Sequence, residues 1–567
     1  MKPRHEPDRV AVLGNGPVGQ STALLLARWG VPVVLLDARP ERDPIGSKAI
    51  CQQRDVLDVW ESVGAGRRIA AEGVTWRTAR TFHRDAELFA DDLPDPGRSP
   101  FPPFVNISQA RTEQILDERI AAEPLIEVRW NHRVSALTQD GRGVAITCET
   151  QAGRTHVEAG YAVACVGARG DDVRRMLGVR FDGHSFEDRF LICDIRADLP
   201  GWATERRFYF DPPWNPGRQV LIHPCPDSTF RIDWQVAGGY DLDAEEAGGG
   251  LDARIQAVIG ERNYEIVWKS VYRFHARVVD RMRVGRVLLA GDCAHLVSPF
   301  GARGLNSGVA DAENAAWKLA FVLHGWAGEE LLESYHAERH AAAEENLEVT
   351  TATMDFMVPR DDEQHRRRLE VLATAAKDPT TVSQVDSGRL AEPFWYAESP
   401  LTTRSAHHPC AGRPPRGSVP PAGPGVLVPD VPISVPGSER GRLREIARDG
   451  FLLLTTEGVD HVAVHEIARQ SSSAPVRVLP LAEADVTLAL GEALATRPGE
   501  VWIVRPDAHV AAVLNAPAPE EVADALRRAH GAAQHAESPR AISDSASVRR
   551  GSTPDMAIPA TGTTEGN

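Results

Sequence analysis

The chain has 567 residues, with 42% hydrophobic residues, 25% charged residues and a formal net charge of −16. This is the composition of a globular protein of two to four domains, and the acidity excludes a general nucleic-acid partner. The polar N-terminus holds no secretory stretch, no segment has the ~20 apolar residues of a membrane span, and we expect none.

The seven cysteines are scattered and never spaced as CxxC. An odd number of isolated cysteines favours reduced thiols over a disulfide framework or a zinc site. We therefore expect a cytoplasmic protein without a bound metal.

The first elements along the chain follow the order strand, turn, helix, strand. A short buried strand over 9–14 precedes a glycine-rich turn, an apolar helix over 21–29 and a second strand over 31–37. This βαβ beginning predicts a parallel sheet.

The turn matches the GxGxxG pattern of dinucleotide sites. Gly14 permits a sharp turn, Gly16 lets a pyrophosphate approach the helix N-terminus, and Gly19 lets helix and strand pack closely. Asp37, at the end of the next strand, accepts hydrogen bonds from a ribose. The nucleotide contacts predicted here are Gly14, Gly16, Pro17, Val18, Gly19 and Asp37.

The middle of the chain is rich in short strands. Periodicity is lost over 75–103, a helix is predicted over 109–119, and strands are predicted over 127–137, 144–150 and 161–166. Aromatic-rich strands follow over 207–210, 220–223, 230–236 and 271–274. We expect these later strands to form a mostly antiparallel sheet in a second domain.

A second glycine-rich turn follows the strand over 286–290. It runs from Gly291 to Asn306 and precedes helices predicted over 310–323 and 331–350. A carboxylate after a strand, here Asp292, can bind a polyol hydroxyl, and amides at a helix N-terminus stabilise negative charge. Reduced flavin carries such charge at its N1–C2=O edge, so this turn favours FAD over NAD.

These motifs resemble the class A flavoprotein aromatic monooxygenases, the para-hydroxybenzoate hydroxylase-like family, from Val10 to Asn346. The resemblance implies that Asp292 holds the ribityl chain and that Gln109 touches the flavin side chain. It also implies that Gly304, Leu305 and Asn306 line the flavin ring, and Pro299 and Gly301 of the same turn are further predicted cofactor contacts.

Arg39, Arg42 and Lys48 are candidates to steer a pyridine nucleotide or an FAD phosphate, and Arg111 is a candidate contact of an FAD phosphate or the isoalloxazine rim. The alternative for each is a solvated surface position. His295 is interpreted as a structural residue of its turn. The chain departs from the family at Val166, where an acid is usual in a stretch that helps bind FAD and NADPH; Asp171 or Asp172 are the nearest substitutes.

The C-terminal region begins after a stretch dense in proline and glycine. Strands are predicted over 451–455, 476–479, 501–505 and 508–514, with helices over 462–470 and 520–529. This part resembles the thioredoxin-like appendage of the phenol-hydroxylase and polyketide-hydroxylase branch. It has no CxxC, so we interpret it as structural or as an aid to homodimerisation rather than as a dithiol catalyst.

The predicted fold class is α/β. It combines a Rossmann-like FAD-binding domain, an inserted mixed or antiparallel β-sheet substrate domain and a C-terminal thioredoxin-like α/β domain. The expected boundaries are 1–180 for the first FAD-binding part (with 74–104 contributing to the substrate domain), 181–275 for the substrate domain, 276–400 for the second FAD-binding part and helices, 401–424 for a linker, 425–532 for the thioredoxin-like domain and 533–567 for a disordered tail.

The resemblance implies an FAD-dependent monooxygenase that takes electrons from NADPH or NADH and hydroxylates a phenolic substrate with molecular oxygen through a flavin C4a-hydroperoxide. Candidate catalytic residues on the middle sheet are His223, Tyr272 and Arg273. The substrate class implied is a small phenolic acid or polyketide-like aromatic. The alternatives are a flavin oxidase or dehydrogenase, a Baeyer–Villiger oxygenase on the same fold, or a non-catalytic FAD-binding protein.

Overall fold

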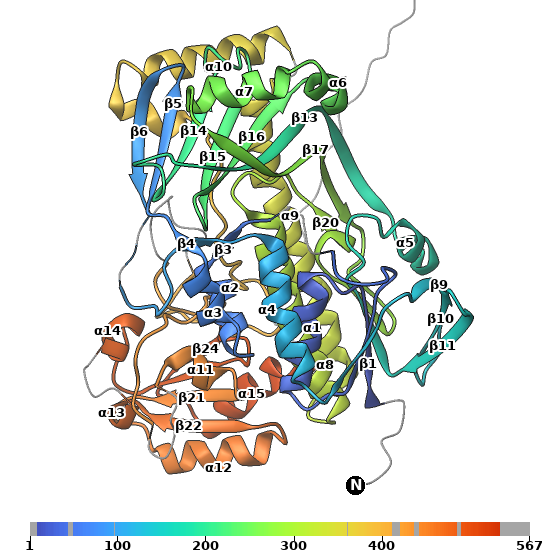
Figure 1. Ribbon diagram of the computed structural model, residues 1–567. Coiled ribbons are helices and arrows are strands. Elements are labelled where there is room, and N and C mark those ends of the chain that lie inside the picture. The colour runs from blue at the N-terminus through green and yellow to red at the C-terminus, as the bar shows by residue number, and fades with distance from the viewer. Residues whose placement is uncertain are drawn as a thin grey trace, which may run out of the picture. The chain divides into compact units, whose positions relative to one another are not determined.

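The computed structural model describes residues 8–43, 49–93, 95, 97–359, 361–410, 420–435, 441–484 and 489–532. Within these residues the chain forms five hydrogen-bonded sheets with helices around them (Figure 1). Lys48, the expected tail over 533–567 and residues 411–419 of the expected linker lie outside the described residues.

The first sheet contains the glycine-rich turns at the ends of its strands. Its order is β18-β19-β12-β1-β2-β8, and all neighbours are parallel except β18 and β19. The strands are β1 (Val10–Leu13), β2 (Val33–Leu36), β8 (Ile126–Arg129), β12 (Tyr161–Ala164), β18 (Arg283–Val284) and β19 (Val287–Leu289). Helices α1 (Pro17–Arg28), α4 (Gln109–Ala121) and α8 (Arg303–Leu323) pack with it. The predicted parallel sheet is present.

The largest sheet has eight strands and is antiparallel except where β14 pairs with β5. Its order is β20 (His295–Leu296), β17 (Tyr264–Val279), β13 (Phe181–Ala197), β16 (Thr229–Val236), β15 (Gln219–Cys225), β14 (Glu205–Phe210), β5 (Thr78–His83) and β6 (Ala86–Asp92). The segment over 75–103 therefore contains a hairpin, which its charged and exposed residues concealed in the sequence.

The two faces of this large sheet are covered by different elements. The outer face, which includes Leu191, Ile232 and Trp234, packs against α7 (Gly250–Ile259). The inner face, which includes Phe190 and Phe208, packs against α9 (Glu333–Met357) and α10 (Asp362–Ala375). Helix α9 connects the two large sheets, since its first half lies beside α8 and its second half reaches the inner face (Figure 1).

Two small sheets complete this part of the fold. One joins β9 (Arg133–Gln139), β10 (Val144–Thr150) and β11 (Gly153–Ala159). The other joins β3 (Cys51–Gln53), β7 (Phe104–Asn106) and β4 (Val74–Thr75). Helices α2 (Arg54–Glu61), α3 (Gly66–Glu72), α5 (Asp171–Leu177) and α6 (Leu242–Ala247) occupy the connections.

The C-terminal segment, defined here as α11 to α15, forms a four-stranded sheet of its own. Its order is β22 (Val476–Pro480), β21 (Phe451–Thr455), β23 (Glu500–Val504) and β24 (Val510–Asn515), with only β21 and β22 parallel. Its helices are α11 (Leu443–Ala447), α12 (His461–Ser471), α13 (Leu481–Ala484), α14 (Ala489–Leu494) and α15 (Pro519–Ala529). The segment shares a hydrophobic core with Trp317 and Phe321 of α8.

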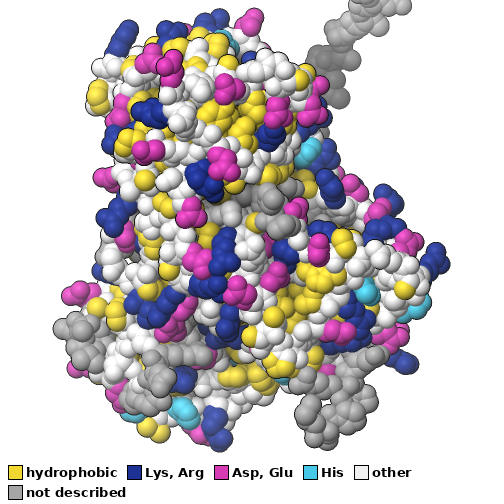
Figure 2. Space-filling view, viewed as in Figure 1, with side chains coloured by type: hydrophobic (Ala, Val, Ile, Leu, Met, Phe, Trp, Pro, Cys, Tyr) yellow, Lys and Arg dark blue, Asp and Glu magenta, His cyan; other side chains and the backbone are white. Residues whose placement is uncertain are grey.

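Acidic and basic side chains are interspersed on the face drawn in Figure 2. Such a surface favours solvation over attachment to one strongly charged partner. Among the described helices, none is long and apolar enough to span a bilayer.

Candidate functional site

The first turn leaves open space in front of a helix N-terminus. Helix α1 begins at Pro17, and its N-cap Gly16 offers no side chain to the first amides. No atom lies within 4 Å of where a Cβ on Gly16 would stand. By contrast, a Cβ on Gly14 would lie 2.4 Å from the carbonyl oxygen of Cys165, and one on Gly19 would lie 1.8 Å from that of Gly14. Packing therefore requires Gly14 and Gly19, whereas Gly16 leaves room for an anionic ligand.

Asp37 closes this turn from the neighbouring strand. One carboxylate oxygen accepts from the Asn15 amide at 2.7 Å, and the other accepts from the Arg39 amide at 2.8 Å. Burial opposes ionisation of Asp37, but hydrogen bonds from Arg39 and from both amides outweigh it and lower the pKa of the carboxyl. Arg39 and Arg42 also donate to the carbonyl oxygen of Asn15, at 3.0 and 2.6 Å. The turn thus has an ionised acid and two guanidinium groups beside it.

The second turn repeats this arrangement. Strand β19 leads into the turn η2 (Gly291–Cys293), on which Asp292 is exposed, and Pro299 is exposed further along. Helix α8 has the N-cap Ala302, with φ 57°, and no side-chain cap. A Cβ on Gly304 would meet only a methyl group of Val297, at 4.0 Å. This second helix N-terminus is also uncovered, and its dipole favours a partial negative charge.

The two turns lie against each other through Val18. A Cβ on Gly291 would lie 3.0 Å from a Val18 methyl group, and one on Gly308 would lie 2.6 Å from it. The absence of side chains at both glycines lets α1 and α8 approach closely. Asn15 Nδ2 and Ser298 Oγ, one on each turn, are buried without a hydrogen-bond partner in the structure. Two uncovered helix N-termini with unpartnered polar atoms fit a dinucleotide such as FAD.

Asp311 of α8 fixes the second turn from behind. Its carboxylate accepts from the Gly291 amide at 2.9 Å and lies 2.8 Å from His295 Nε2, so it holds both sides of Asp292. Arg339 Nε donates to its other oxygen at 2.6 Å. Burial opposes ionisation of Asp311, yet Arg339 and His295 lower its pKa. This is the structural role expected for His295.

Two predicted contacts on α4 have protein partners. The side-chain oxygen of Gln109 accepts from the Ala49 amide at 3.2 Å. Arg111 Nε donates to Glu72 at 2.6 Å, so its guanidinium has a carboxylate beside it. A cofactor role for either residue stays a prediction, and for Arg111 the surface alternative has the observed contact in its favour.

The remaining predicted flavin contacts lie in the first turn of α8 and just before it. Gly301 has φ 88°, and a Cβ there would strike the carbonyl oxygen of Arg389 at 2.1 Å. Leu305 is half-buried. Asn306 is buried and tied to β3, accepting from the Gln53 amide and donating to the Cys51 carbonyl, both at 3.0 Å. The Asn306 side chain therefore connects α8 to β3.

A polar row crosses the inner face of the large sheet. Strand pairing places Trp268, Asp194, Arg231 and His223 side by side, one per strand, and Arg206 lies on the next strand, β14. Asp194 and Arg231 form a buried two-pronged ion pair, with distances of 2.7 and 2.9 Å. Such a pair neutralises both charges where water is scarce.

His223 and Asp233 differ from this pair, since each keeps an unpartnered atom. His223 Nδ1 and Asp233 Oδ1 are buried without a hydrogen-bond partner in the structure. Burial and the nearby Arg206 and Arg231 hold the pKa of His223 well below its usual value, so the imidazole is neutral. Burial raises the pKa of Asp233 to about 7, against the pull of Arg231. Sequence reasoning missed Asp233, because an isolated acid in a strand gives no signal until its burial is known.

The second turn and β3 lie next to this face. Phe300 packs edge-on against Phe190 and Phe274, with ring centroids 5.4 and 6.2 Å apart. Asn106 Nδ2 of β7 donates to the Pro224 carbonyl, one residue beyond His223, at 2.8 Å. Gln52 of β3, the strand paired with β7, is fully buried, and neither end of its amide has a hydrogen-bond partner in the structure. Polar atoms without partners thus lie both on β3 and on the inner face of the large sheet, the two elements next to the second turn.

The three predicted catalytic residues do not share a face. Strand pairing places Tyr272 opposite Phe190, on the inner face with His223. Arg273 pairs with Arg189, points to the opposite face, is exposed and donates to the Phe186 carbonyl at 2.8 Å. The alternation of strand side chains therefore separates Arg273 from His223 and Tyr272.

At Val166, where the family usually has an acid, the side chain makes apolar contacts. Val166 packs against the core of the first sheet. The nearby Arg174 is buried and donates to the carbonyl oxygens of Ala168 and Cys293, both at 3.1 Å, so it ties this region to the second turn. Asp171 lies 2.6 Å from Arg174 and is otherwise exposed; Asp172 pairs with Arg175.

Comparisons with known proteins agree with this geometry. Residues 8–350 match the family described as FAD binding domain. The 3-(3-hydroxy-phenyl)propionate/3-hydroxycinnamic acid hydroxylase of Mycobacterium sp. (strain JLS) is 28% identical over 65% of this chain, and the chain spans 64% of that protein, just under two thirds. A flavin-dependent monooxygenase of Mycobacteroides abscessus is 32% identical over 60% of this chain and 73% of that protein.

A solved structure extends the likeness beyond the family match. The ternary complex of aklavinone-11 hydroxylase with FAD and aklavinone superposes with a TM-score of 0.75 at 26% identity. The match covers 93% of this chain and 99% of that one. The fold is a mixed α/β FAD-binding monooxygenase fold with several sheets.

Proposed function

This chain belongs to the FAD binding domain family, and on that premise we propose that it is an FAD-dependent, NAD(P)H-using monooxygenase that hydroxylates a phenolic aromatic substrate. The observation that carries the proposal is the position of two uncovered helix N-termini beside an inner sheet face with unpartnered polar atoms. The relatives named as hydroxylases and monooxygenases support it.

The proposed FAD contacts are the first turn with Asp37 and Arg39, and the second turn from Asp292 to Asn306. The ribityl chain would bind Asp292, and the amides at the start of α8 would face the flavin edge that becomes negative on reduction. Bound FAD would supply electron transfer from the nicotinamide and activation of molecular oxygen. The protein's part is to bind, orient and exclude water.

The proposed substrate position lies between Gln52 and the inner face of the large sheet. Asp233, with a pKa near 7, would accept the phenol proton at Oδ1, because a base is most effective when its pKa is close to the working pH. Neutral His223 would hydrogen-bond a ring substituent, with Tyr272 on the same face. Arg273 is left out of this set because it lies on the other face.

The proposed substrate is a small phenolic acid or a polyketide-like aromatic, bound at the inner face that carries Arg231, paired with Asp194, and the buried Arg206. Aklavinone in the related complex supports the polyketide-like option for this chain.

The division into domains is part of the proposal: an FAD-binding part over 1–180 and 276–400, a substrate part over 181–275 with 74–104, and a thioredoxin-like part over 425–532. The mixed four-stranded sheet formed by β21 to β24 supports the last of these. We also propose homodimerisation through that part. The seven cysteines all fall in the described residues and all are free, which supports a cytoplasmic location.

The test is an aerobic assay of the full chain with FAD, NADPH or NADH, and a panel of phenols, phenolic acids and polyketide-like quinols. We expect one compound to accelerate NAD(P)H oxidation and to gain one oxygen atom. A product that loses two hydrogens would indicate an oxidase or dehydrogenase, and an ester formed from a ketone would indicate a Baeyer–Villiger oxygenase. FAD binding with no compound that speeds reduction would overturn the proposal and direct attention to Val166.

A further inference from the structure

We propose that Arg505, in the C-terminal segment, is a positioning residue for the flavin site: through a buried chain of ionic contacts it holds α8 and the turn of Asp292 in the geometry that binds FAD. The inference rests on FAD binding at the two turns and not on the hydroxylation reaction. It gives the C-terminal segment a role that needs neither a dithiol nor a second subunit.

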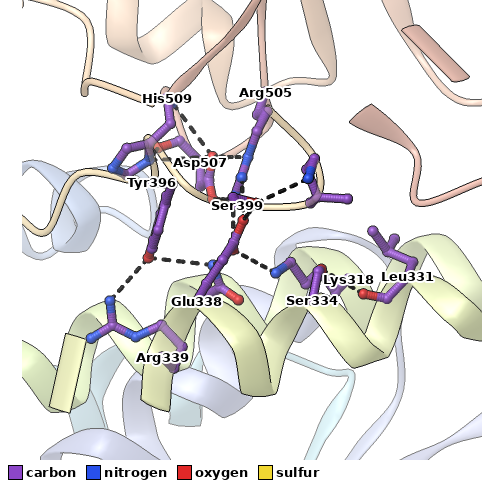
Figure 3. Close-up of polar contacts among 12 residues, drawn as sticks. Lys318, Leu331, Ser334, Glu338, Arg339, Tyr396, Ser399, Arg505, Asp507 and His509 are labelled. Atoms are coloured by element: carbon purple, nitrogen blue, oxygen red, sulfur yellow. Dashed lines mark hydrogen bonds and ion pairs between the residues drawn. The ribbon is translucent and has the colours of Figure 1, made fainter. Parts of the chain in front are cut away.

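The chain of contacts starts at the end of β23. The Arg505 guanidinium donates to both carboxylate oxygens of Glu338 on α9, with distances of 2.5 and 3.0 Å, and both side chains are fully buried (Figure 3). Asp507 lies 3.0 Å from Arg505 Nε and accepts from Trp317 Nε1 of α8 at 3.2 Å. One arginine thus joins the C-terminal segment, α9 and α8.

Glu338 passes the contact to α8. Its carboxylate accepts from Lys318 Nζ at 2.6 Å and from Asn314 Nδ2 at 2.7 Å. Burial opposes ionisation of Glu338, but Arg505 and Lys318 together lower its pKa, so the Glu338 carboxylate is an anion between two cations. Such a group tolerates little displacement, because moving one partner leaves the others charged in an apolar surrounding.

Tyr396 and Arg339 complete the path to the flavin turn. Arg505 lies over the Tyr396 ring, 4.9 Å from its centroid, and the Tyr396 hydroxyl accepts from Arg339 Nη1 at 2.9 Å (Figure 3). Arg339 follows Glu338 on α9 and donates to Asp311 at 2.6 Å and to the Ser307 carbonyl at 3.2 Å. Asp311 in turn binds the Gly291 amide and His295, on either side of Asp292.

A simpler interpretation is that Arg505 only attaches the C-terminal segment. The same interface offers a matched comparison, since Arg28 at the end of α1 pairs with Asp449 at 2.8 Å and also binds the Arg448 carbonyl at 2.6 Å. That pair is partly exposed and reaches the far end of α1, away from both glycine turns. If Arg505 only attached the C-terminal segment, variants of Arg505 and Arg28 would differ in their free energy of unfolding and not in FAD binding.

The experiment compares Arg505→Met, Arg505→Lys and Arg28→Met in the full chain. The readouts are the Kd of the apoprotein for FAD, by quenching of flavin fluorescence, and the flavin reduction potential. We expect Arg505→Met to raise the Kd by about 10-fold, a size common for remote couplings, and to lower the potential because the α8 N-terminus loses its fixed position. Arg505→Lys keeps the charge without the two-pronged geometry and recovers part of the loss. Arg28→Met leaves the Kd for FAD within about 2-fold of the original and leaves the flavin reduction potential unchanged.

Tyr396→Phe covers the case in which Arg505→Met does not fold. It keeps the ring under Arg505 and removes only the hydroxyl that Arg339 contacts, and we expect the Kd for FAD to rise about 3-fold. The inference is overturned if the folded variants of Arg505 and Tyr396 bind FAD as the original chain does, or if Arg28→Met weakens FAD equally. If the original chain itself binds no FAD, the proposed function fails along with it, whereas normal FAD binding in every variant refutes this inference alone.

Discussion

Gly16→Ala separates the space needed by the cofactor from the space needed by the fold. Gly16 has φ −91° and ψ −176°, an extended conformation that alanine adopts without strain, and nothing lies within 4 Å of the new Cβ. The free energy of unfolding of the Gly16→Ala apoprotein should therefore lie within about 0.5 kcal/mol of the original value. The methyl group instead fills the room in which a diphosphate approaches the amides of α1.

The expected loss is on the cofactor side. Displacing the diphosphate removes one hydrogen bond to a charged group, worth about 1.5–3 kcal/mol, which corresponds to a Kd for FAD that is roughly 10- to 100-fold higher. The assay pairs denaturant unfolding of the apoprotein with FAD titration. Gly19→Ala is the contrasting variant, because its Cβ would strike the Gly14 carbonyl and lower the stability of the apoprotein itself. Unchanged FAD affinity in folded Gly16→Ala would refute the assignment of this turn.

Three further predictions concern the inner face of the large sheet. Asp194→Asn leaves Arg231 buried without its counter-charge and should lower the free energy of unfolding by about 3–5 kcal/mol, measured by denaturant titration; a loss below about 1 kcal/mol would contradict the ion-pair account. For Asp233, the folded pKa of about 7 lies above the unfolded value, so the native state holds the extra proton between about pH 4 and 7 and stability falls as pH rises. Asp233→Asn should remove that slope, at most about 1.4 kcal/mol per pH unit, and lower kcat about 100-fold; an unaltered slope would show that this carboxyl ionises normally. His223→Gln should lower kcat while FAD affinity stays constant, and equal loss of both would place His223 in the cofactor site.

The sequence predicted the elements whose signals are local. Both glycine turns, the helix after the first of them and the strand that ends before Gly291 are short-range patterns, because backbone geometry depends on neighbouring residues. The helix itself begins at Pro17, four residues earlier than the predicted start at residue 21. The short strands of the C-terminal segment were also predicted, since each is an apolar run bounded by turn residues.

The long strands and the charge network were not predictable in the same way. Strand β13 spans Phe181–Ala197, and its first half is largely polar and only partly buried, so its pairing with β17 and not its composition makes it a strand. Glu338 and Arg505 lie 167 positions apart, and each alone looks like a solvated surface charge. Only the packing of α8, α9 and β23 reveals that these charges are buried together.

Side-chain alternation along a strand puts neighbours such as Tyr272 and Arg273 on opposite faces, but it does not say which face lies beside the flavin turns. That depends on Phe300 and α9 covering one side and α7 covering the other. For the same reason Asp233 became a candidate only after its face and its burial were known.

The most direct test of the central claim is to run the reaction under isotopically heavy dioxygen with NADPH or NADH and the substrate that best accelerates NAD(P)H oxidation. We expect a hydroxylated product that carries one heavy oxygen atom, formed in step with NAD(P)H consumption. Consumption of NAD(P)H that yields only hydrogen peroxide, or a product whose new oxygen comes from water, would contradict it.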